Sequence, residues 1–156
     1  MNITIRPAEK SDVPIIRKLI LEGIAIWGEG LETNLKPWVD VITTIDYIEK
    51  NIVSSQYEIF VAEHEETIVG TISLDYNNPS ISHMGGLYCD VKGQGLGTLL
   101  LQYAMKSSRD KEYRKMECEI YEGNYPSISL MEKYGAYHAD SNTIAEVTYR
   151  RYEFNL

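Results

Sequence analysis

The chain has 156 residues, of which 44% are apolar, so it is long enough to bury one ordinary hydrophobic core. Its net charge of −8 argues against a nucleic-acid partner, because binding to phosphates needs a concentrated basic surface. No apolar run approaches the roughly 20 residues of a membrane span, and the first ten residues lack the apolar core of a secretory signal. We therefore expect a cytoplasmic protein with no membrane partner.

The N-terminal third predicts one short strand followed by helices. Residues 3–6 alternate as a strand, and Ser11 is the expected cap of a helix that ends near Gly23. The stretch 27–38 contains two glycines and a proline and is predicted as a loop. The apolar spacing in 44–52 then predicts a second helix.

The middle of the chain is predicted to form strands. Two of them, at about 57–63 and 67–75, are separated by a tight polar connection. A further strand covers about 82–91 and contains the glycine pair 85–86. Two glycines inside a strand indicate a bulge or a close approach of another backbone.

The C-terminal part continues with alternating helices and strands. A helix is predicted over 98–109 and a strand over 115–121. A short helix follows over 126–135, where a proline opens it and a glycine closes it. The segment 145–156 predicts the last strand, and one more short strand is expected near 136–139.

The cysteines and histidines do not have the spacing of a metal site. Cys89 and Cys118 stand 29 residues apart, each in an apolar or strand-like setting, so two reduced thiols are expected. The three histidines are scattered along the chain. No metal centre is therefore predicted.

The segment KGQGLG, residues 92–97, places three glycines at alternate positions between a strand and a helix. The first N–H groups of a helix lack internal partners and carry partial positive charge, and glycines let the backbone come close to a phosphate. The spacing differs from the G-x-G-x-x-G of dinucleotide folds and from a P-loop, which needs G-K-[ST]. The loop therefore predicts a phosphate-bearing ligand of another kind.

The loop resembles the pyrophosphate loop of the GNAT superfamily of N-acetyltransferases, usually written [RQ]-x-x-G-x-[GA]. The opening ITIRPAEKSDVPIIRKLI and the segment NYPSISLMEKYGA are similar to that family, and the predicted elements follow its order. The resemblance implies an α/β (α+β) fold, with a mixed, mostly antiparallel central sheet of six to seven strands flanked by about four helices, in a single domain over 1–156. It also implies direct transfer of an acetyl group from acetyl-CoA to a primary amine of a small molecule.

The resemblance also implies where the co-substrate binds. The loop amides would hold the pyrophosphate of coenzyme A, and the strand before them would pair with the pantetheine arm, which sits where this strand splays from the next. Asn124 would lie at the cofactor's edge, and it is equally expected to cap the helix after it. The implied cofactor-binding residues are Leu87, Tyr88, Cys89, Lys92, Gly93, Gly95, Leu96, Gly97, Thr98 and Asn124.

The catalytic acid departs from the family pattern. The tyrosine of the family's L-Y-x-x-x-G segment, its frequent acid, is replaced here by Met131, which is expected to pack in the core. Tyr134 lies three residues later, near the same helix face, and is the predicted acid. Further candidates are Tyr88, Tyr121, Tyr137 and Cys89.

The catalytic base and the exact register of the cofactor strand stay open. LYCDVKGQG reads as two residues shorter than the family's L-x-V-x-P-x-x-R-G, or else Leu87 and Cys89 take the places of the valine and proline. His83, near the start of this strand, is the predicted base, because a histidine titrates near neutral pH. The alternatives are Asp75, Glu117 and Glu119.

The acceptor is expected to be a small cationic amine, such as a polyamine, an amino sugar or an amino acid derivative. In this family the first two helices and their loop usually shape the acceptor site, and here that region is rich in acidic and aromatic residues. Peptide and protein acceptors stay open. The residues in question are Glu22, Trp27, Glu29, Glu32, Trp38, Asp40, Asp46 and Glu49.

Two other functions compete with this one. An acyl-CoA-binding sensory or interaction module with little catalysis would fit the missing tyrosine at position 131. A nicotinamide-dependent enzyme would bind NAD instead of coenzyme A. The resemblance also allows a homodimer formed through the last strands.

Overall fold

The structure is a computed structural model that describes residues 2–27, 34–90 and 92–156. Its strands are β1 Thr4–Pro7, β2 Tyr57–His64, β3 Thr67–Asp75, β4 Ser82–Met84, β5 Tyr88–Cys89, β6 Lys115–Tyr121, β7 Tyr137–Ile144 and β8 Val147–Asn155. Its helices are the 3-10 turn η1 Lys10–Asp12, α1 Val13–Trp27, α3 Lys36–Ile42, α4 Ile45–Val53, α5 Leu96–Asp110 and α6 Tyr125–Lys133. Within the described residues, none of these helices is both long and apolar enough to span a bilayer.

The described strands form one mixed sheet in the order β1-β2-β3-β4-β6-β8-β7, and β5 pairs with β3 beside β4. Every strand pair is antiparallel except β4 with β6, which confirms the predicted mixed, mostly antiparallel sheet. The described part of the chain has eight strands, more than the six to seven expected, because the strand predicted over 82–91 is divided into β4 and β5. The short strand predicted near 136–139 is longer than expected and forms β7, Tyr137–Ile144.

The helices differ from the prediction at the N-terminal end, where α3 lies partly within the segment predicted as a loop. Pro37 stands in the first turn of α3, where a proline starts a helix and does not break it. Ser11 lies inside η1, and Glu9 and Asp12 form the capping box instead. Gly23 does not end α1, which continues to Trp27.

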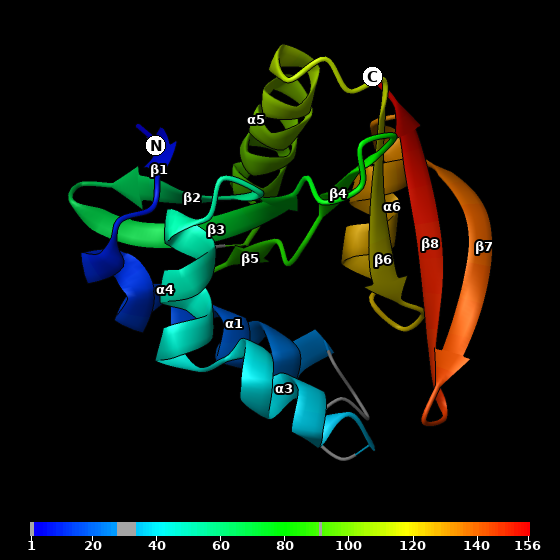
Figure 1. The fold of residues 1–156 in the computed structure, drawn as a ribbon, viewed down its shortest axis with the longest axis horizontal. Helices are drawn as coiled ribbons and strands as arrows, with labels where there is room; N and C mark the ends of the chain where they lie inside the picture. Colours follow the sequence, from blue (N-terminus) through cyan, green and yellow to red (C-terminus); the bar gives the residue numbers. More distant parts are fainter. Residues whose placement is uncertain (1, 28–33, 91) are drawn as a thin grey trace.

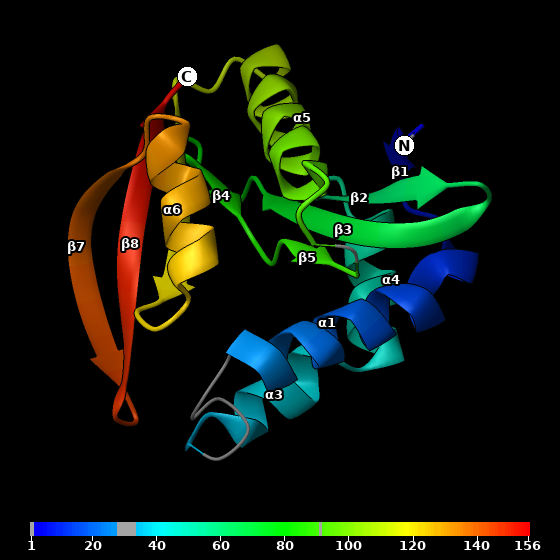
Figure 2. The ribbon, with the colours of Figure 1, turned by 180° about the vertical axis from the view of Figure 1, so that it is seen from behind.

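Helices cover both faces of the sheet. Val61 of β2 faces α1 and α4, where it packs with Ile16 and Ile48 in a small apolar cluster. Ile72 of β3 belongs to the main core, together with Leu100 of α5 and apolar residues of α6. Figure 2 shows α5 and α6 on the same side of the sheet. The alternation of side chains along β2 and β3 therefore separates the two layers.

The sheet divides into two arms that diverge from β4. In Figure 1, β1–β3 form one arm and β6, β8 and β7 form the other. The arms are joined at β4, where Ser82 pairs with Met116 and His83 pairs with Glu117. Beyond this point β5 pairs with β3, so β5 and β6 separate. This geometry confirms the splay that the family resemblance implied.

Candidate functional site

The glycine loop between β5 and α5 has a backbone that few other residues adopt. Gly93 and Gly95 have φ angles of 75° and 76°, in the left-handed region. A Cβ on either glycine would meet no heavy atom of the described chain within 4 Å. The backbone conformation, and not a lack of space, therefore explains why glycine stands at both positions. A Cβ on Gly97 would lie 3.3 Å from Leu130 Cδ2, which shows that this glycine lets α5 pack against α6.

The N-terminus of α5 offers backbone donors beside this loop. Gly95 is the N-cap and supplies no side-chain acceptor, and Leu99 N donates to Gly95 O at 3.1 Å to begin the helical hydrogen bonds. The N–H groups of Leu96, Gly97 and Thr98 precede this bond, at the positive end of the helix dipole. The Leu96 side chain is buried, so only its backbone can face a ligand. The side chain of Lys92, which the resemblance places at the pyrophosphate, is exposed.

A β-bulge separates β4 from β5. Met84 pairs with Leu74 and Tyr88 pairs with Thr71, so three residues on one strand oppose two on the other. The glycine pair 85–86 lies in this interval, which confirms the bulge predicted from the sequence.

The bulged strand presents a backbone donor to the gap between the arms. Asp90 N donates to Val69 O at 2.9 Å, so this N–H points toward β3. Successive N–H groups of a strand alternate in direction, so the N–H of Cys89, also in β5, points away from β3 and into the gap. This group would pair with an extended chain lying there.

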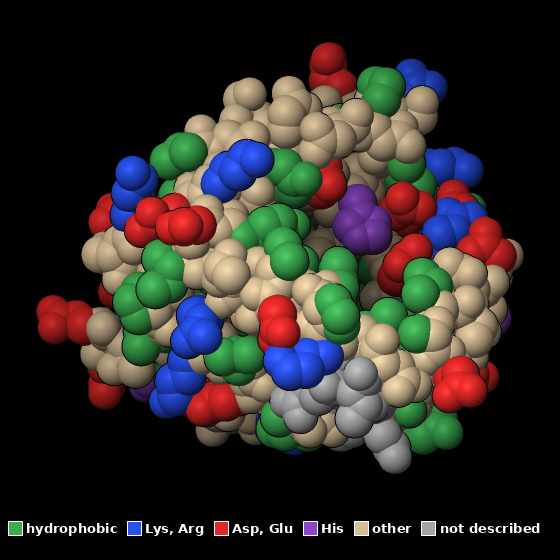
Figure 3. Space-filling view, turned by 60° about the horizontal axis from the view of Figure 1, so that its bottom comes forward, with side chains coloured by type: hydrophobic (Ala, Val, Ile, Leu, Met, Phe, Trp, Pro, Cys, Tyr) green, Lys and Arg blue, Asp and Glu red, His purple; other side chains and the backbone are tan. Residues whose placement is uncertain are grey.

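A pocket of about 660 Å³ lies on the side of the sheet that faces α1, α3 and α4. Figure 3 shows a hollow on this face, with a histidine and acidic side chains at its rim. We call the lining residues of α1, α3 with its N-cap, and α4 the helical wall: Ile16, Ile20, Gly23, Ile24, Leu35, Trp38, Ile42, Tyr47, Ile48 and Asn51. Tyr88 apart, we call the polar strand residues of the lining the sheet wall: Tyr57, Thr71, Ser73, Asp75, His83, Glu119, Tyr121 and Tyr149.

Tyr88 also lines the pocket, and two glycines fix its ring. A Cβ on Gly23 of α1 would overlap the ring, at 2.6 Å from Cε1. A Cβ on Gly86 would lie 2.7 Å from Cζ and 2.9 Å from the hydroxyl oxygen. The ring is therefore held between α1 and the bulge, and its hydroxyl end lies over Gly86.

Burial raises the pKa values of the hydroxyl groups of Tyr88 and Tyr149, which are protonated at neutral pH in any case. Desolvation is the largest cause that raises the pKa of each hydroxyl to about 12. The Tyr149 hydroxyl is buried and has no hydrogen-bond partner among the described residues. Tyr149 comes from β8 and packs in the same small cluster as Tyr88, so the two tyrosines bridge the arms.

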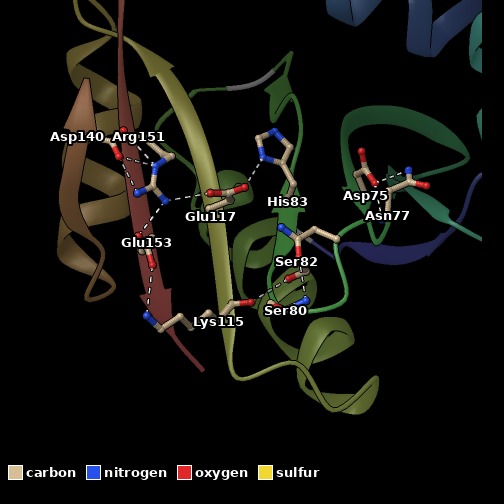
Figure 4. A network of polar contacts seen from close by, with 11 residues as sticks. Asp75, Asn77, Ser80, Ser82, His83, Lys115, Glu117, Asp140, Arg151 and Glu153 are labelled. Atoms are coloured by element: carbon tan, nitrogen blue, oxygen red, sulfur yellow. Dashed lines mark hydrogen bonds and ion pairs between the residues drawn. The ribbon is translucent and has the colours of Figure 1, made fainter. Parts of the chain in front are cut away.

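A line of charges leads from the pocket to the far edge of the sheet. His83 Nδ1 lies 3.6 Å from Glu117 Oε1, and Arg151 Nη1 donates to Glu117 Oε2 at 3.0 Å. Arg151 also donates to Asp140 and Glu153. Figure 4 shows these contacts crossing from β4 over β6 to β8. Glu117 therefore lies between the imidazole of His83 and the guanidinium of Arg151.

Helix α6 brings three of its residues to the pocket. Asn124 Oδ1 accepts a hydrogen bond from Ser127 N at 3.3 Å, which confirms that Asn124 caps the helix, and both residues line the pocket. Met131 lines the pocket as well, at the position of the family's usual tyrosine. Tyr134 is the C-cap of α6 and packs against the main core, outside the described lining.

The acidic residues expected at the acceptor site lie elsewhere in the described part of the chain. Glu22 and Asp40 each pair with a lysine four residues earlier on the same helix. Asp46 and Glu49 are likewise absent from the described lining, and of this set Trp38 is the residue that lines the pocket.

The carboxylates of the described lining come from the sheet instead. They belong to Asp75 of β3 and Glu119 of β6. These strands lie in different arms of the sheet, so the sequence pattern did not show that the two carboxylates line the same pocket. The Trp27 side chain and the residues Glu29 and Glu32 lie outside the described part of the chain. Sequence reasoning also missed the role of Tyr149, since no local pattern marks it.

Both cysteines are free thiols with raised pKa values. Burial raises the pKa of Cys89 to about 11 and that of Cys118 to about 12. The thiols are therefore protonated and poorly nucleophilic at neutral pH. Among the described residues, no cluster of three or more His, Cys, Asp or Glu side chains has a metal-binding arrangement.

Solved structures share this fold over nearly the whole chain. PaiA N-acetyltransferase from Thermoplasma acidophilum, in complex with coenzyme A, superposes with a TM-score of 0.84 at 19% identity, over 99% of this chain and 100% of that one. The yncA protein of Salmonella typhimurium, with its cofactor acetyl-CoA, gives 0.80 at 20% identity, over 100% and 95%. An N-acetyltransferase from Staphylococcus aureus gives 0.78 at 22% identity, over 99% of each chain.

The family follows from a separate comparison. No curated protein matches the chain. The model of the acetyltransferase (GNAT) family matches residues 27–136, which is more than half of the sequence and includes the bulge, the glycine loop and α6. The chain therefore belongs to the acetyltransferase (GNAT) family.

Proposed function

We propose that the protein transfers an acetyl group from acetyl-CoA directly to a primary amine of a small molecule. The observation that carries the proposal is the pocket, which joins the gap beside β5 to the space under α1, α3 and α4. The complexes of the Thermoplasma and Salmonella proteins with coenzyme A and acetyl-CoA support the choice of co-substrate. Since the lining runs from Ile16 to Tyr149, we propose that residues 1–156 act as one domain.

The residues at the gap fit acetyl-CoA, which supplies an activated acetyl thioester when bound. The N–H of Cys89 faces the gap, the glycines with left-handed φ angles leave the loop surface without side chains, and the α5 N-terminus attracts anionic oxygen. Leu87 and Cys89 would hold the pantetheine arm, and Asn124 would lie at its edge. The pyrophosphate would be held by Lys92 and by the backbone of Gly93, Gly95, Leu96, Gly97 and Thr98.

His83 is the base in this proposal. Its imidazole accepts the proton that the attacking amine loses, and Glu117, held by Arg151, lies 3.6 Å from its Nδ1. Asp75 and Glu119 of the sheet wall are the alternatives. Mutation of each candidate in turn separates the three, because only the loss of the true base removes the fall in rate on the acidic side of the pH–rate profile.

Tyr88 is the acid that the geometry favours. Its hydroxyl is protonated and lies over the bulge, on the strand proposed to hold the co-substrate, and donates a proton to the departing sulfur. Tyr134, which the sequence predicts for this role, lies outside the described lining, and its role stays a prediction. Tyr88→Phe is expected to lower kcat about 100-fold, in the range of general acid catalysis, whereas Tyr134→Phe leaves it unchanged. The opposite result would return the role to Tyr134.

Thermal unfolding with acetyl-CoA and, in parallel, with NAD tests the co-substrate. A ligand at about 100 times its Kd adds roughly 2.7 kcal/mol, which raises Tm by several degrees in a domain of this size. We expect the rise with acetyl-CoA alone, followed by amine-dependent release of thiol. No rise with acetyl-CoA would refute the reading of the glycine loop.

The competing function is an acyl-CoA-binding module with little catalysis. Met131 favours it, because a thioether in the pocket replaces the family's usual proton donor. Stabilisation by acetyl-CoA together with no thiol release across a broad panel of amines would establish this alternative.

A further inference from the structure

The described lining of the pocket has two chemically different sides. The described helical wall is aliphatic or aromatic except at Gly23 and Asn51, and none of its side chains carries a charge at neutral pH. The sheet wall carries the carboxylates of Asp75 and Glu119 beside His83, and apolar strand residues such as Ile59 and Ile120 lie among them. A molecule that fills this space therefore meets the charged groups of the described lining on the sheet side alone.

The mouth of the helical wall exposes large apolar side chains. Trp38 of α3 is 52% exposed and Tyr47 of α4 is 36% exposed, and both line the pocket. An aromatic ring half in water gains little from its own fold and is suited to cover an apolar ligand. Val41, also on α3 and 55% exposed, lies outside the described lining and serves as a matched reference.

The two sides discriminate among classes of amine. A second ammonium group on the acceptor, as in a polyamine, would lie against the helical wall and lose its water without gaining a carboxylate. The hydroxyl groups of an amino sugar would lose hydrogen bonds to water in the same place. A hydrocarbon or aromatic body loses nothing there and gains buried area.

From this division we propose that the acceptor is a primary monoamine carried on an apolar body, either aromatic or aliphatic. The proposal rests on the acetyltransferase function above and names its substrate class. The amino group faces the sheet wall, near His83, and the apolar body lies against Trp38, Ile42 and Ile24. This excludes two of the three amine classes expected from the sequence.

Matched acceptors test the proposal. The kcat/KM for acetylation is measured with linear alkylamines of increasing length, with 2-phenylethylamine, and with hexylamine against 1,6-diaminohexane. We expect kcat/KM to rise about fourfold per methylene, which corresponds to burial of one CH₂ group. Hexylamine is expected to exceed the diamine at least tenfold, and cyclohexylamine to exceed glucosamine by a similar factor.

Two variants of α3 locate the effect. Trp38→Ala is expected to lower kcat/KM at least tenfold for 2-phenylethylamine and far less for ethylamine, because ethylamine carries little hydrocarbon to bury against the Trp38 ring. Val41→Ala is expected to change neither. Trp38→Glu should improve the diamine relative to hexylamine, since it places a carboxylate on the helical wall, whose described residues have none.

The outcomes separate the two levels of the proposal. Preference for the diamine or for glucosamine by the unaltered protein would overturn the substrate class while leaving the acetyltransferase function intact. Equal losses with Trp38→Ala and Val41→Ala would also overturn it, since a general weakening of α3 would then explain both. No thiol release with any amine, despite stabilisation by acetyl-CoA, would instead refute the proposed function.

Discussion

Gly23 and Tyr88 are expected to be strongly coupled in stability. In Gly23→Ala the new Cβ would overlap Tyr88 Cδ1 and lie 2.6 Å from Cε1, whereas carbon atoms prefer about 3.5–4.0 Å, so the ring must move by roughly 1.5 Å. Overpacking of this kind destabilises by about 1–3 kcal/mol. Alanine also gains about 1 kcal/mol over glycine inside a helix such as α1. The net change in the unaltered background is therefore a loss of about 0–2 kcal/mol.

The same substitution should reverse its sign when the ring is absent. In the Tyr88→Ala background, Gly23→Ala has only the helical gain and should stabilise by about 1 kcal/mol. Equilibrium unfolding in urea of the four proteins then gives a coupling free energy of about 1–3 kcal/mol. An equal effect of Gly23→Ala in both backgrounds would show that the ring is not held by this glycine.

Three further predictions test the loop, a cap and an ion pair. Gly95→Ala is expected to lower the free energy of unfolding by about 1–2 kcal/mol, because its φ is 76°, and to weaken acetyl-CoA in a thermal shift assay. Asn124→Ala removes the α6 cap and should cost about 1 kcal/mol in urea unfolding. Hydrogen bonding to Arg6 holds the pKa of Asp12 below its ordinary range, so this stabilisation is complete above about pH 4 and is lost as pH falls through the depressed pKa. Asp12→Asn should flatten the acid side of the stability profile, and an unchanged profile would contradict the assignment.

The features that the sequence predicted correctly are those with a local cause. The bulge follows from two adjacent glycines within a strand, and the start of α5 follows from the change of pattern after KGQGLG. Asn124 precedes a proline-led helix and caps it, as its side chain and position require. Such signals need no knowledge of distant residues.

The missed features depend on distant partners. Gly23 was predicted to end a helix because a glycine often follows the last turn. Its lack of a Cβ instead makes room for the ring of Tyr88, which is 65 positions away in the sequence. The acidic residues of α1, α3 and α4 suggested a cation site. Two of them, Glu22 and Asp40, instead form ion pairs with lysines on the surface of their own helices. Asp75 and Glu119 were alternative bases from the sequence, but that both line one pocket depends on how the two arms of the sheet are arranged.

The glycines around Tyr88 bear on what its hydroxyl does. A glycine inside a helix costs about 0.5–1 kcal/mol relative to alanine; Gly23 of α1 is such a glycine, and Gly86 of the bulge lies on the other side of the same ring. If the ring served only to fill space, Tyr88→Phe would preserve both stability and turnover, because it keeps the ring and removes one oxygen. If the hydroxyl is the acid, Tyr88→Phe keeps the urea midpoint and loses turnover, while Gly23→Ala in the Tyr88→Ala background regains stability without regaining turnover. Measuring stability and kcat on the same variants therefore separates the packing of this tyrosine from its chemistry.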